Sequence, residues 1–196
     1  MARPRVTEGD VVLDAAARRL TKSGIAGTTV DDVAGEAGVS RATVYRYVGG
    51  KDEIVRAVIG RETTTVLDRL RRVIEGSERA TVAIADVVTT ALVAIGESPV
   101  LARLSTTDLR DTLPFVTVDA ASLVGAVVET LAPALRSAPF PVEDRHLEDA
   151  IEELTRFVLA ELTTPRRNDS RLDPAAAGRR ATVLIAPLIE TEEGAT

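Results

Sequence analysis

The sequence is poor in the residues that build most catalytic and metal centres. It contains no cysteine, no tryptophan, one methionine and one histidine among 196 residues. Without cysteine, disulfides, thiolate zinc sites, iron–sulfur clusters and a cysteine nucleophile are excluded. The single histidine, His146, excludes a multi-histidine metal centre and is the one candidate base for a serine triad. We therefore expect that the chain is not an enzyme and holds no cofactor.

Signals for secretion and for a membrane span are also lacking. The first ten residues contain no apolar run of signal-peptide length. The longest apolar stretches, 82–96 and 113–135, are interrupted by acidic residues and fall short of about 20 uninterrupted apolar residues. We expect a cytoplasmic protein with no membrane partner.

Basic residues are outnumbered by acidic ones, 24 to 30, but the imbalance is uneven. Residues 1–60 carry nine Lys and Arg against eight Asp and Glu, a net charge of +1. Residues 61–196 carry fifteen against twenty-two, a net charge of -7. Nucleic-acid binding depends on a local positive face more than on total charge, so the overall acidity does not exclude it.

Apolar residues recur at helical spacing along almost the whole chain. For example, Leu13, Ala16, Ala17 and Leu20 share one face of a helix. No segment alternates apolar and polar residues over strand length. The expected fold class is all-α. The predicted helices cover residues 8–23, 30–37, 41–48, 51–76, 78–96, 99–107, 113–136, 143–163 and 174–190.

Two short predicted helices flank a tight turn in the first fifty residues. Thr29 caps the first helix, with Asp32 three positions on. Gly38 permits the turn, Val39 fills the space between the helices, and Ser40 caps the second helix. This is the helix-turn-helix arrangement, in which the second helix enters the major groove of DNA. The alternative is a helical hairpin with no role in DNA binding.

The second short helix carries side chains suited to DNA. Arginine, present as Arg41 and Arg46, makes bidentate contacts to guanine, and tyrosine and threonine hydroxyls suit phosphate oxygens. Two alternatives stay open for these side chains. The arginines can be solvated without contacting a base, and Tyr45 and Tyr47 can be packing residues. Lys51, just past the helix, is a further phosphate candidate.

The segment GIAGTTVDDVAGEAGVSRATVYRYVGGKDEIVRAVI resembles the N-terminal domain of TetR-type transcriptional regulators. The match covers residues 8–60 and departs at Val48, where the family usually has phenylalanine, and at Gly49-Gly50. Val48 is still expected to pack inward, but it fills less volume. Carried over by position, the resemblance implies base contacts from Arg41, Ala42 and Arg46, and phosphate contacts from Thr29, Ser40, Thr43, Tyr45, Tyr47 and Lys51.

The resemblance also implies a domain plan and a function. It implies a three-helix DNA-binding domain over residues 1–50 and a larger helical domain over 51–196 that binds an effector and dimerises. The expected protein is a homodimeric, ligand-responsive regulator. It is expected to act as a repressor that a small apolar effector releases from a palindromic operator of double-stranded DNA. The alternative is a DNA-binding regulator controlled by a protein partner.

Two further sets of residues are assigned from the C-terminal part. Residues 113–131 are apolar on nearly every side, which predicts a central helix that is either a pocket wall or plain core. The apolar stripes of the last two predicted helices suit either the core of their own subunit or a four-helix dimer interface. The expected pocket residues are Thr89, Leu92, Leu104, Leu109, Phe115, Val116, Leu123 and Val127. The expected interface residues are Leu147, Ile151, Leu154, Val158, Leu162, Val183, Leu184 and Leu188.

Overall fold

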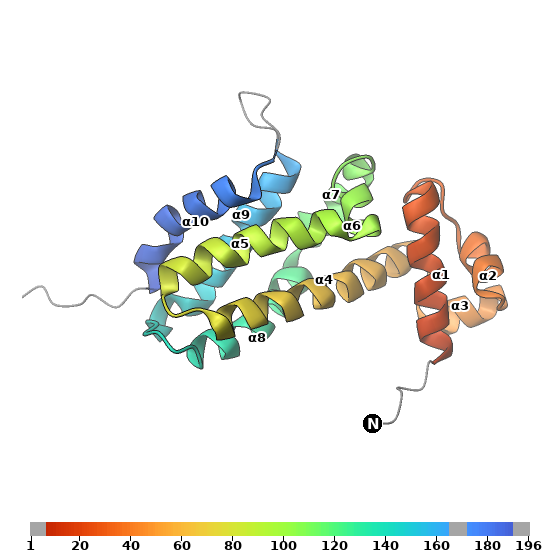
Figure 1. Ribbon diagram of the computed structural model, residues 1–196. Coiled ribbons are helices and arrows are strands. Elements are labelled where there is room, and N and C mark those ends of the chain that lie inside the picture. Colours follow the sequence, from red (N-terminus) through yellow and green to blue (C-terminus); the bar gives the residue numbers. More distant parts are fainter. Residues whose placement is uncertain (1–6, 165–171, 190–196) are drawn as a thin grey trace, which may run out of the picture. The chain divides into compact units, whose positions relative to one another are not determined.

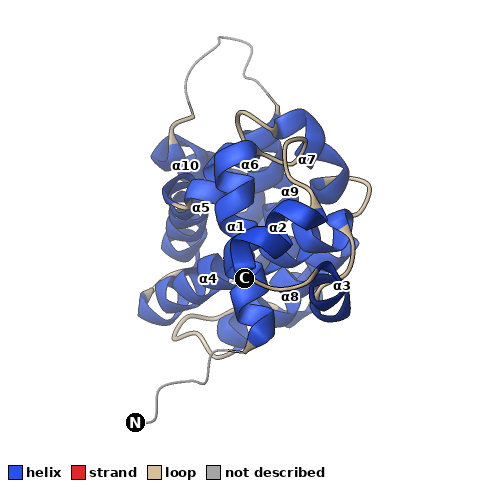
Figure 2. Cartoon of the chain, turned by 90° about the vertical axis from the view of Figure 1, so that its right-hand side faces the viewer, coloured by secondary structure: helices blue, strands red, loops and turns tan. Residues whose placement is uncertain are grey.

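The computed structural model describes residues 7–164 and 172–189, and every regular element within these ranges is a helix (Figure 2). The predicted all-α fold class is therefore confirmed. Packing divides the chain into two compact units. The N-terminal unit extends to Thr63 and includes Ser98–Phe115, and the C-terminal unit holds Thr64–Glu97 and the chain from Val116 onward.

The N-terminal unit contains a three-helix group and two further short helices. The group is α1 (Glu8–Ser23), α2 (Val30–Ala37) and α3 (Arg41–Tyr47), followed by the start of the long helix α4 (Lys51–Gly76) (Figure 1). The short helices are α6 (Pro99–Leu104) and α7 (Leu109–Val116). The fully buried apolar side chains of the first four helices in this unit include Val12, Leu20, Val33, Val44 and Val58.

Each of the first two helices begins with a capping box, formed by a threonine and the aspartate three residues after it. Thr29 accepts a hydrogen bond from the backbone N–H of Asp32 at 3.1 Å, and the Asp32 carboxylate accepts one from the Thr29 N–H at 2.9 Å. Thr7 and Asp10 repeat this exchange at the start of α1. The N-cap predicted at Thr29 is confirmed, and the reciprocal bonds satisfy backbone donors that the first helical turn leaves free.

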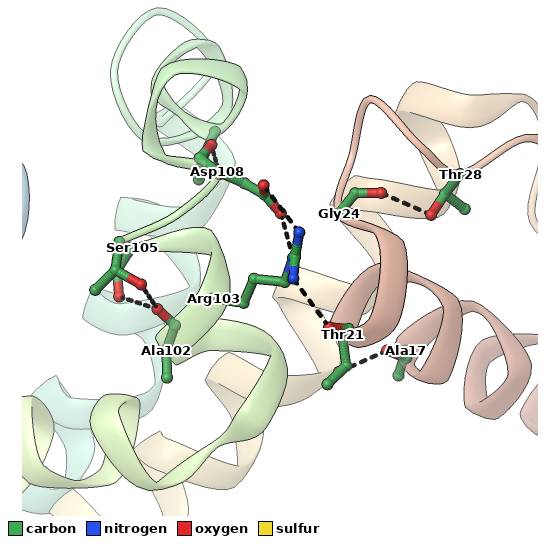
Figure 3. Close-up of polar contacts among 10 residues, drawn as sticks. Ala17, Thr21, Gly24, Thr28, Ala102, Arg103, Ser105 and Asp108 are labelled. Carbon is green, nitrogen blue, oxygen red and sulfur yellow. Dashed lines mark hydrogen bonds and ion pairs between the residues drawn. The ribbon is translucent and has the colours of Figure 1, made fainter.

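A part-buried ion pair holds the segment after α6 against the end of α1 (Figure 3). Arg103 Nε donates to Asp108 Oδ2 at 2.7 Å, and Arg103 Nη1 donates to the carbonyl oxygen of Thr21 at 3.5 Å. Gly24 follows α1 with a φ of 72°. A Cβ at this position would lie 2.3 Å from a carboxylate oxygen of Asp108, so glycine permits the close approach.

The C-terminal unit contains the rest of α4 and the remaining helices. These are α5 (Ala80–Glu97), α8 (Ala121–Arg136), a short 3-10 helix (Asp144–His146), α9 (Leu147–Thr163) and α10 (Pro174–Ile189). Helices α5 and α10 lie side by side (Figure 1). Their backbones approach closely at Gly178, where a Cβ would lie 2.4 Å from the carbonyl oxygen of Ala85.

Helix α5 is long and apolar enough to cross a membrane by length and composition. In the structure 44% of this window is buried inside the protein, and Ala83, Val87 and Val88 are among its core residues. The central helix of a water-soluble domain has the same character, so this composition is weak evidence for a membrane span.

The single helix predicted over residues 113–136 is wrong. Two helices, α7 and α8, cover this region, and residues 117–120 form a turn between them. Pro114 lies inside α7, where it cannot donate a backbone hydrogen bond to the preceding turn, rather than at the start of a helix. The expectation of one central helix is wrong as well, because the apolar residue Val118 lies in the turn and is 87% exposed.

Candidate nucleic-acid interface

Helix α3 is fixed to the N-terminal unit by a cap, a turn and one buried side chain. Gly38 adopts the left-handed conformation with φ 69° and ψ 28°, which turns the chain after α2. The Ser40 hydroxyl accepts a hydrogen bond from the backbone N–H of Thr43 at 3.1 Å. Val44 is 0% exposed and is the one buried residue of α3, so most of this short helix is available at the surface.

The three predicted base-contacting residues lie on this helix and are exposed. Arg41, Ala42 and Arg46 all have open side chains. The two guanidinium groups lie near tyrosine rings, with Arg41 Cζ 5.5 Å from the ring centroid of Tyr45 and Arg46 Cζ 4.8 Å from that of Tyr47. The alternative that these tyrosines are packing residues is not favoured, because the residues are 47% and 46% exposed.

The predicted phosphate contacts lie in the same unit. Thr29 and Ser40 are exposed, whereas Thr43 and Lys51 are half-buried. The hydroxyl groups of Ser40 and Thr43 are hydrogen-bonded to each other at 2.9 Å. Lys51 Nζ donates to the carbonyl oxygen of Ala26 at 3.4 Å, a long bond that leaves donors of the ammonium group for another acceptor.

Two acidic partners of this surface were missed by sequence reasoning. Arg41 Nη1 donates to Asp31 Oδ2 at 3.2 Å, and Arg46 Nη2 donates to Glu8 Oε2 at 3.3 Å. A hydrogen bond to the Tyr45 hydroxyl and the charge of Asp31 raise the pKa of Arg41 above its usual value. In the sequence, Glu8 and Asp31 lie in the first turns of α1 and α2. Acidic residues are favoured there by the helix dipole, so their positions did not by themselves indicate a partner on α3.

The two departures from the family pattern lie directly after α3. Val48 is the residue after the helix, and its N–H donates to the carbonyl oxygen of Val44 at 2.9 Å. Its side chain is half-buried, so the expected inward packing is incomplete. Gly49 follows with a φ of 112°, a conformation that favours glycine over other residues.

The expected effector-pocket residues are distributed over both units. Leu104, Leu109 and Phe115 belong to the N-terminal unit, and the other five belong to the C-terminal unit. Leu92 and Leu104 are 2% exposed. The Thr89 hydroxyl donates to the carbonyl oxygen of Ala85 at 2.7 Å, and Arg56 lies 5.5 Å from the ring centroid of Phe115. Their role in a pocket stays a prediction.

A small apolar cavity of about 30 Å³ lies within the C-terminal unit. Side chains from α4, α5, α8, α9 and α10 line it, among them Ile74, Val87, Leu131, Leu147 and Ile151. None of the eight expected pocket residues lines this cavity. Its volume is far below the roughly 300–1,000 Å³ typical of ligand pockets, so a ligand of ordinary size must open this core to enter it.

The expected interface residues divide by burial. Leu147 and Ile151 are 0% and 3% exposed, so they belong to the core of their own chain and offer no free surface. Leu154, Val158 and Leu162 are half-buried. On α10 the residues Val183, Leu184 and Leu188 are 77%, 60% and 36% exposed, so these apolar side chains are not covered by the part of the chain that the structure describes.

Two family models match the chain. One, described as bacterial regulatory proteins of the tetR family, matches residues 12–58. The other, described as the bacterial tetracyclin repressor C-terminal domain, matches residues 80–184, which is more than half of the chain. The first match contains the helix-turn-helix, and the second covers parts of the C-terminal unit together with Ser98–Phe115 of the N-terminal unit.

Similar proteins support the same assignment. An uncharacterised HTH-type transcriptional regulator of Mycobacterium tuberculosis, Rv1255c, is 30% identical over 173 residues, which is 86% of this chain and 81% of the relative. The TetR-family repressor AlkX of Dietzia sp. has a TM-score of 0.74 at 23% identity, with 94% of this chain and 96% of that chain covered. The TetR-family repressor QsdR of R. erythropolis has a TM-score of 0.69 at 20% identity, with 91% and 94% covered. These relatives are transcriptional regulators rather than enzymes. The chain belongs to the tetR family of bacterial regulatory proteins.

Proposed function

We propose that this protein is a homodimeric, ligand-responsive transcriptional repressor that acts in the bacterial cytoplasm. The DNA-binding domain comprises residues 1–50, and residues 51–196 bind the effector and dimerise. The observation that best supports the proposed DNA binding is the exposure of α3. A single buried side chain, Val44, anchors the helix, while Arg41 and Arg46 stay open to an approaching duplex.

In the proposed complex, α3 of each subunit enters a major groove. A two-fold dimer places two such helices about 34–36 Å apart, which matches successive major grooves on one side of the duplex. Arg41 and Arg46 read guanine edges, Ala42 contacts a base, and the predicted hydroxyl and ammonium groups bind phosphates. The operator is therefore expected to be a near-palindrome.

The exposed apolar face of α10 supports the proposed dimer. Val183, Leu184 and Leu188 are exposed on α10, whereas Ala181 and Ile185 of the same helix are buried. A second copy of the same face covers these side chains when two chains pair about a two-fold axis. Leu154, Val158 and Leu162 of α9 lose their remaining exposure in the same interface.

The apolar character of the C-terminal unit supports an aliphatic effector. The lining of the 30 Å³ cavity is apolar, and the whole chain holds only three Phe and two Tyr, which disfavours a pocket built on aromatic stacking. The effector acts by binding one arrangement of the dimer more tightly than the arrangement that fits DNA. Thr89, Leu92 and Val127 are the first residues to vary in mapping its site.

Selection of duplexes from a random-sequence pool by the purified full chain tests this function. The proposal predicts enrichment of an inverted repeat bound by an even number of subunits. Linear aliphatic molecules of graded length are then added to the complex with the enriched duplex, and release by one of them is the expected outcome. A pool that shows no enrichment contradicts the DNA-binding proposal. Enrichment without release by small molecules, together with a stable complex with another protein, favours control by a protein partner.

A further inference from the structure

Both arginines assigned to base contact are paired with carboxylates from other helices. Arg41 is paired with Asp31 of α2 at 3.2 Å, and Arg46 with Glu8 of α1 at 3.3 Å. All four side chains are open to solvent, with 58% to 68% of each exposed. Neither carboxylate takes part in the reciprocal capping boxes, which use Asp10 and Asp32.

The pairs restrain the two guanidinium groups in the same manner. Arg41 is held at Nη1 by Asp31, and its Nη2 donates to the Tyr45 hydroxyl at 3.2 Å. Arg46 is held by Glu8 and lies close to the ring of Tyr47. A guanidinium has five N–H donors, so each arginine keeps donors for a base edge while it stays bound to its carboxylate.

The pairs also lower the net positive charge that this surface presents to DNA. Binding to any duplex is driven by cations that neutralise phosphates and release counterions. An arginine held by a carboxylate adds no net charge at its position, so its contribution to that general attraction is small. A guanine edge instead presents the neutral acceptors O6 and N7, and their recognition depends on the orientation of the donors.

We propose that Asp31 and Glu8 are specificity-determining positioning residues, which orient Arg41 and Arg46 for base edges and withhold them from phosphates. This inference rests on the proposed DNA-binding function. Its consequence is that the two carboxylates lower the affinity for random DNA while they preserve the affinity for the preferred sequence.

Neutral variants of nearly the same shape test the proposal. Asp31→Asn and Glu8→Gln remove the charge of each carboxylate. Asp14→Asn and Glu36→Gln are matched controls in the same unit, because they remove the same charge from carboxylates paired with Arg61 at 2.7 Å and Arg18 at 2.9 Å. Neither of those arginines lies on α3. Thermal unfolding of each full-length variant checks that the fold is retained.

The measurement is the dissociation constant, by fluorescence anisotropy over a range of salt, for the duplex enriched from the random pool and for a random-sequence duplex of equal length. Asp31→Asn is expected to strengthen binding to the random duplex by about two- to fivefold and to steepen its log–log salt dependence by up to about one charge. Binding to the enriched duplex should stay within about twofold or weaken, so the ratio of the two affinities falls. The control variants should leave this ratio unchanged.

Two results would overturn the inference while leaving the proposed function intact. In the first, Asp31→Asn and Glu8→Gln strengthen binding to both duplexes by equal factors, as the controls do, which would mean that these carboxylates act through total charge alone. In the second, the affinity ratio rises, which would mean that they obstruct the arginines. If the unaltered chain prefers no duplex, the proposed function fails, and this inference fails with it.

Discussion

Arg103 joins two segments of the N-terminal unit that are far apart in sequence. Its guanidinium binds Asp108 ahead of α7 and the carbonyl oxygen of Thr21 at the end of α1. The side chain of Asp108 is 12% exposed and that of Arg103 is 29% exposed, so this pair is less screened by water than the ion pairs on α3.

We expect Asp108→Asn to lower the free energy of unfolding by about 1–2 kcal/mol, because it leaves the part-buried Arg103 without its charged partner. Chemical denaturation measures the change. Glu36→Gln, which breaks the more exposed pair with Arg18, is the control and should cost less than about 0.5 kcal/mol. If both variants lose the same free energy of unfolding, the burial of the Arg103 pair does not add to stability.

At the residue scale, the sequence predicted the exposed side chains of α3 but not their partners. The caps at Thr29 and Ser40 and the turn at Gly38 predicted where α2 and α3 begin and where the chain turns between them, and all three features are found in the structure. The pairs of Arg41 with Asp31 and Arg46 with Glu8 depend on how three helices cross. No spacing rule along one helix contains that information.

At the scale of elements, the capping boxes make the first two helices sensitive to acid. Hydrogen bonds from the hydroxyl and the backbone N–H of Thr29 lower the pKa of Asp32 below its ordinary value of 3.8. Hydrogen bonds from Thr7 act in the same way on Asp10. The folded state therefore holds fewer protons than the unfolded state in this range, and stability falls as the pH falls.

We expect Asp32→Asn to lower the free energy of unfolding near neutral pH, where the carboxylate contribution is fully present. The difference from the unaltered chain should shrink as the pH drops below about 4 and through the lowered pKa. Urea denaturation at a series of pH values measures this difference. Thr29→Ala, which removes the hydroxyl cap, should cost about 1 kcal/mol near neutral pH. A difference for Asp32→Asn that stays constant with pH would contradict the argument.

The contact of α5 with α10 depends on the absence of a side chain at Gly178. We expect Gly178→Ala to destabilise the protein by about 1–3 kcal/mol, because its Cβ would lie 2.4 Å from the carbonyl oxygen of Ala85 and 2.6 Å from the Thr89 hydroxyl. Gly96→Ala in α5 is the control, since nothing lies within 4 Å of its Cβ and alanine favours helix. Thermal unfolding of both variants makes the comparison, and a neutral Gly178→Ala would contradict the close packing.

Most helices were predicted within a few residues of their observed ends, and the error at 113–136 has a clear cause. Periodicity reports which residues share a face, but it does not distinguish one helix from two successive helices in different units. Pro114 was expected near a helix start, whereas it lies inside α7. The sequence pattern also did not predict that α6 and most of α7 pack in one unit with the first three helices, because these segments lie about eighty residues apart in the chain.

At the scale of the whole molecule, the proposed dimer is tested on α10. We expect Leu184→Glu to give a monomer, because it places a charge in an apolar interface, and to lose most affinity for an inverted-repeat duplex. Light scattering measures the mass in solution. Val82→Glu alters an exposed apolar side chain of α5 and should leave the mass unchanged. If Leu184→Glu remains a dimer, the interface does not include this face of α10.

The central claim is that α3 reads DNA sequence, and the affinity of the Arg41→Ala variant for two duplexes tests it most directly. With the inverted repeat enriched by the unaltered chain, Arg41→Ala is predicted to weaken binding by roughly 10- to 100-fold, with a much smaller loss on random DNA. Arg18→Ala, on α1, should leave the preference between the two duplexes intact. Equal losses of Arg41→Ala on both duplexes, or an undiminished preference for the inverted repeat, would contradict the claim.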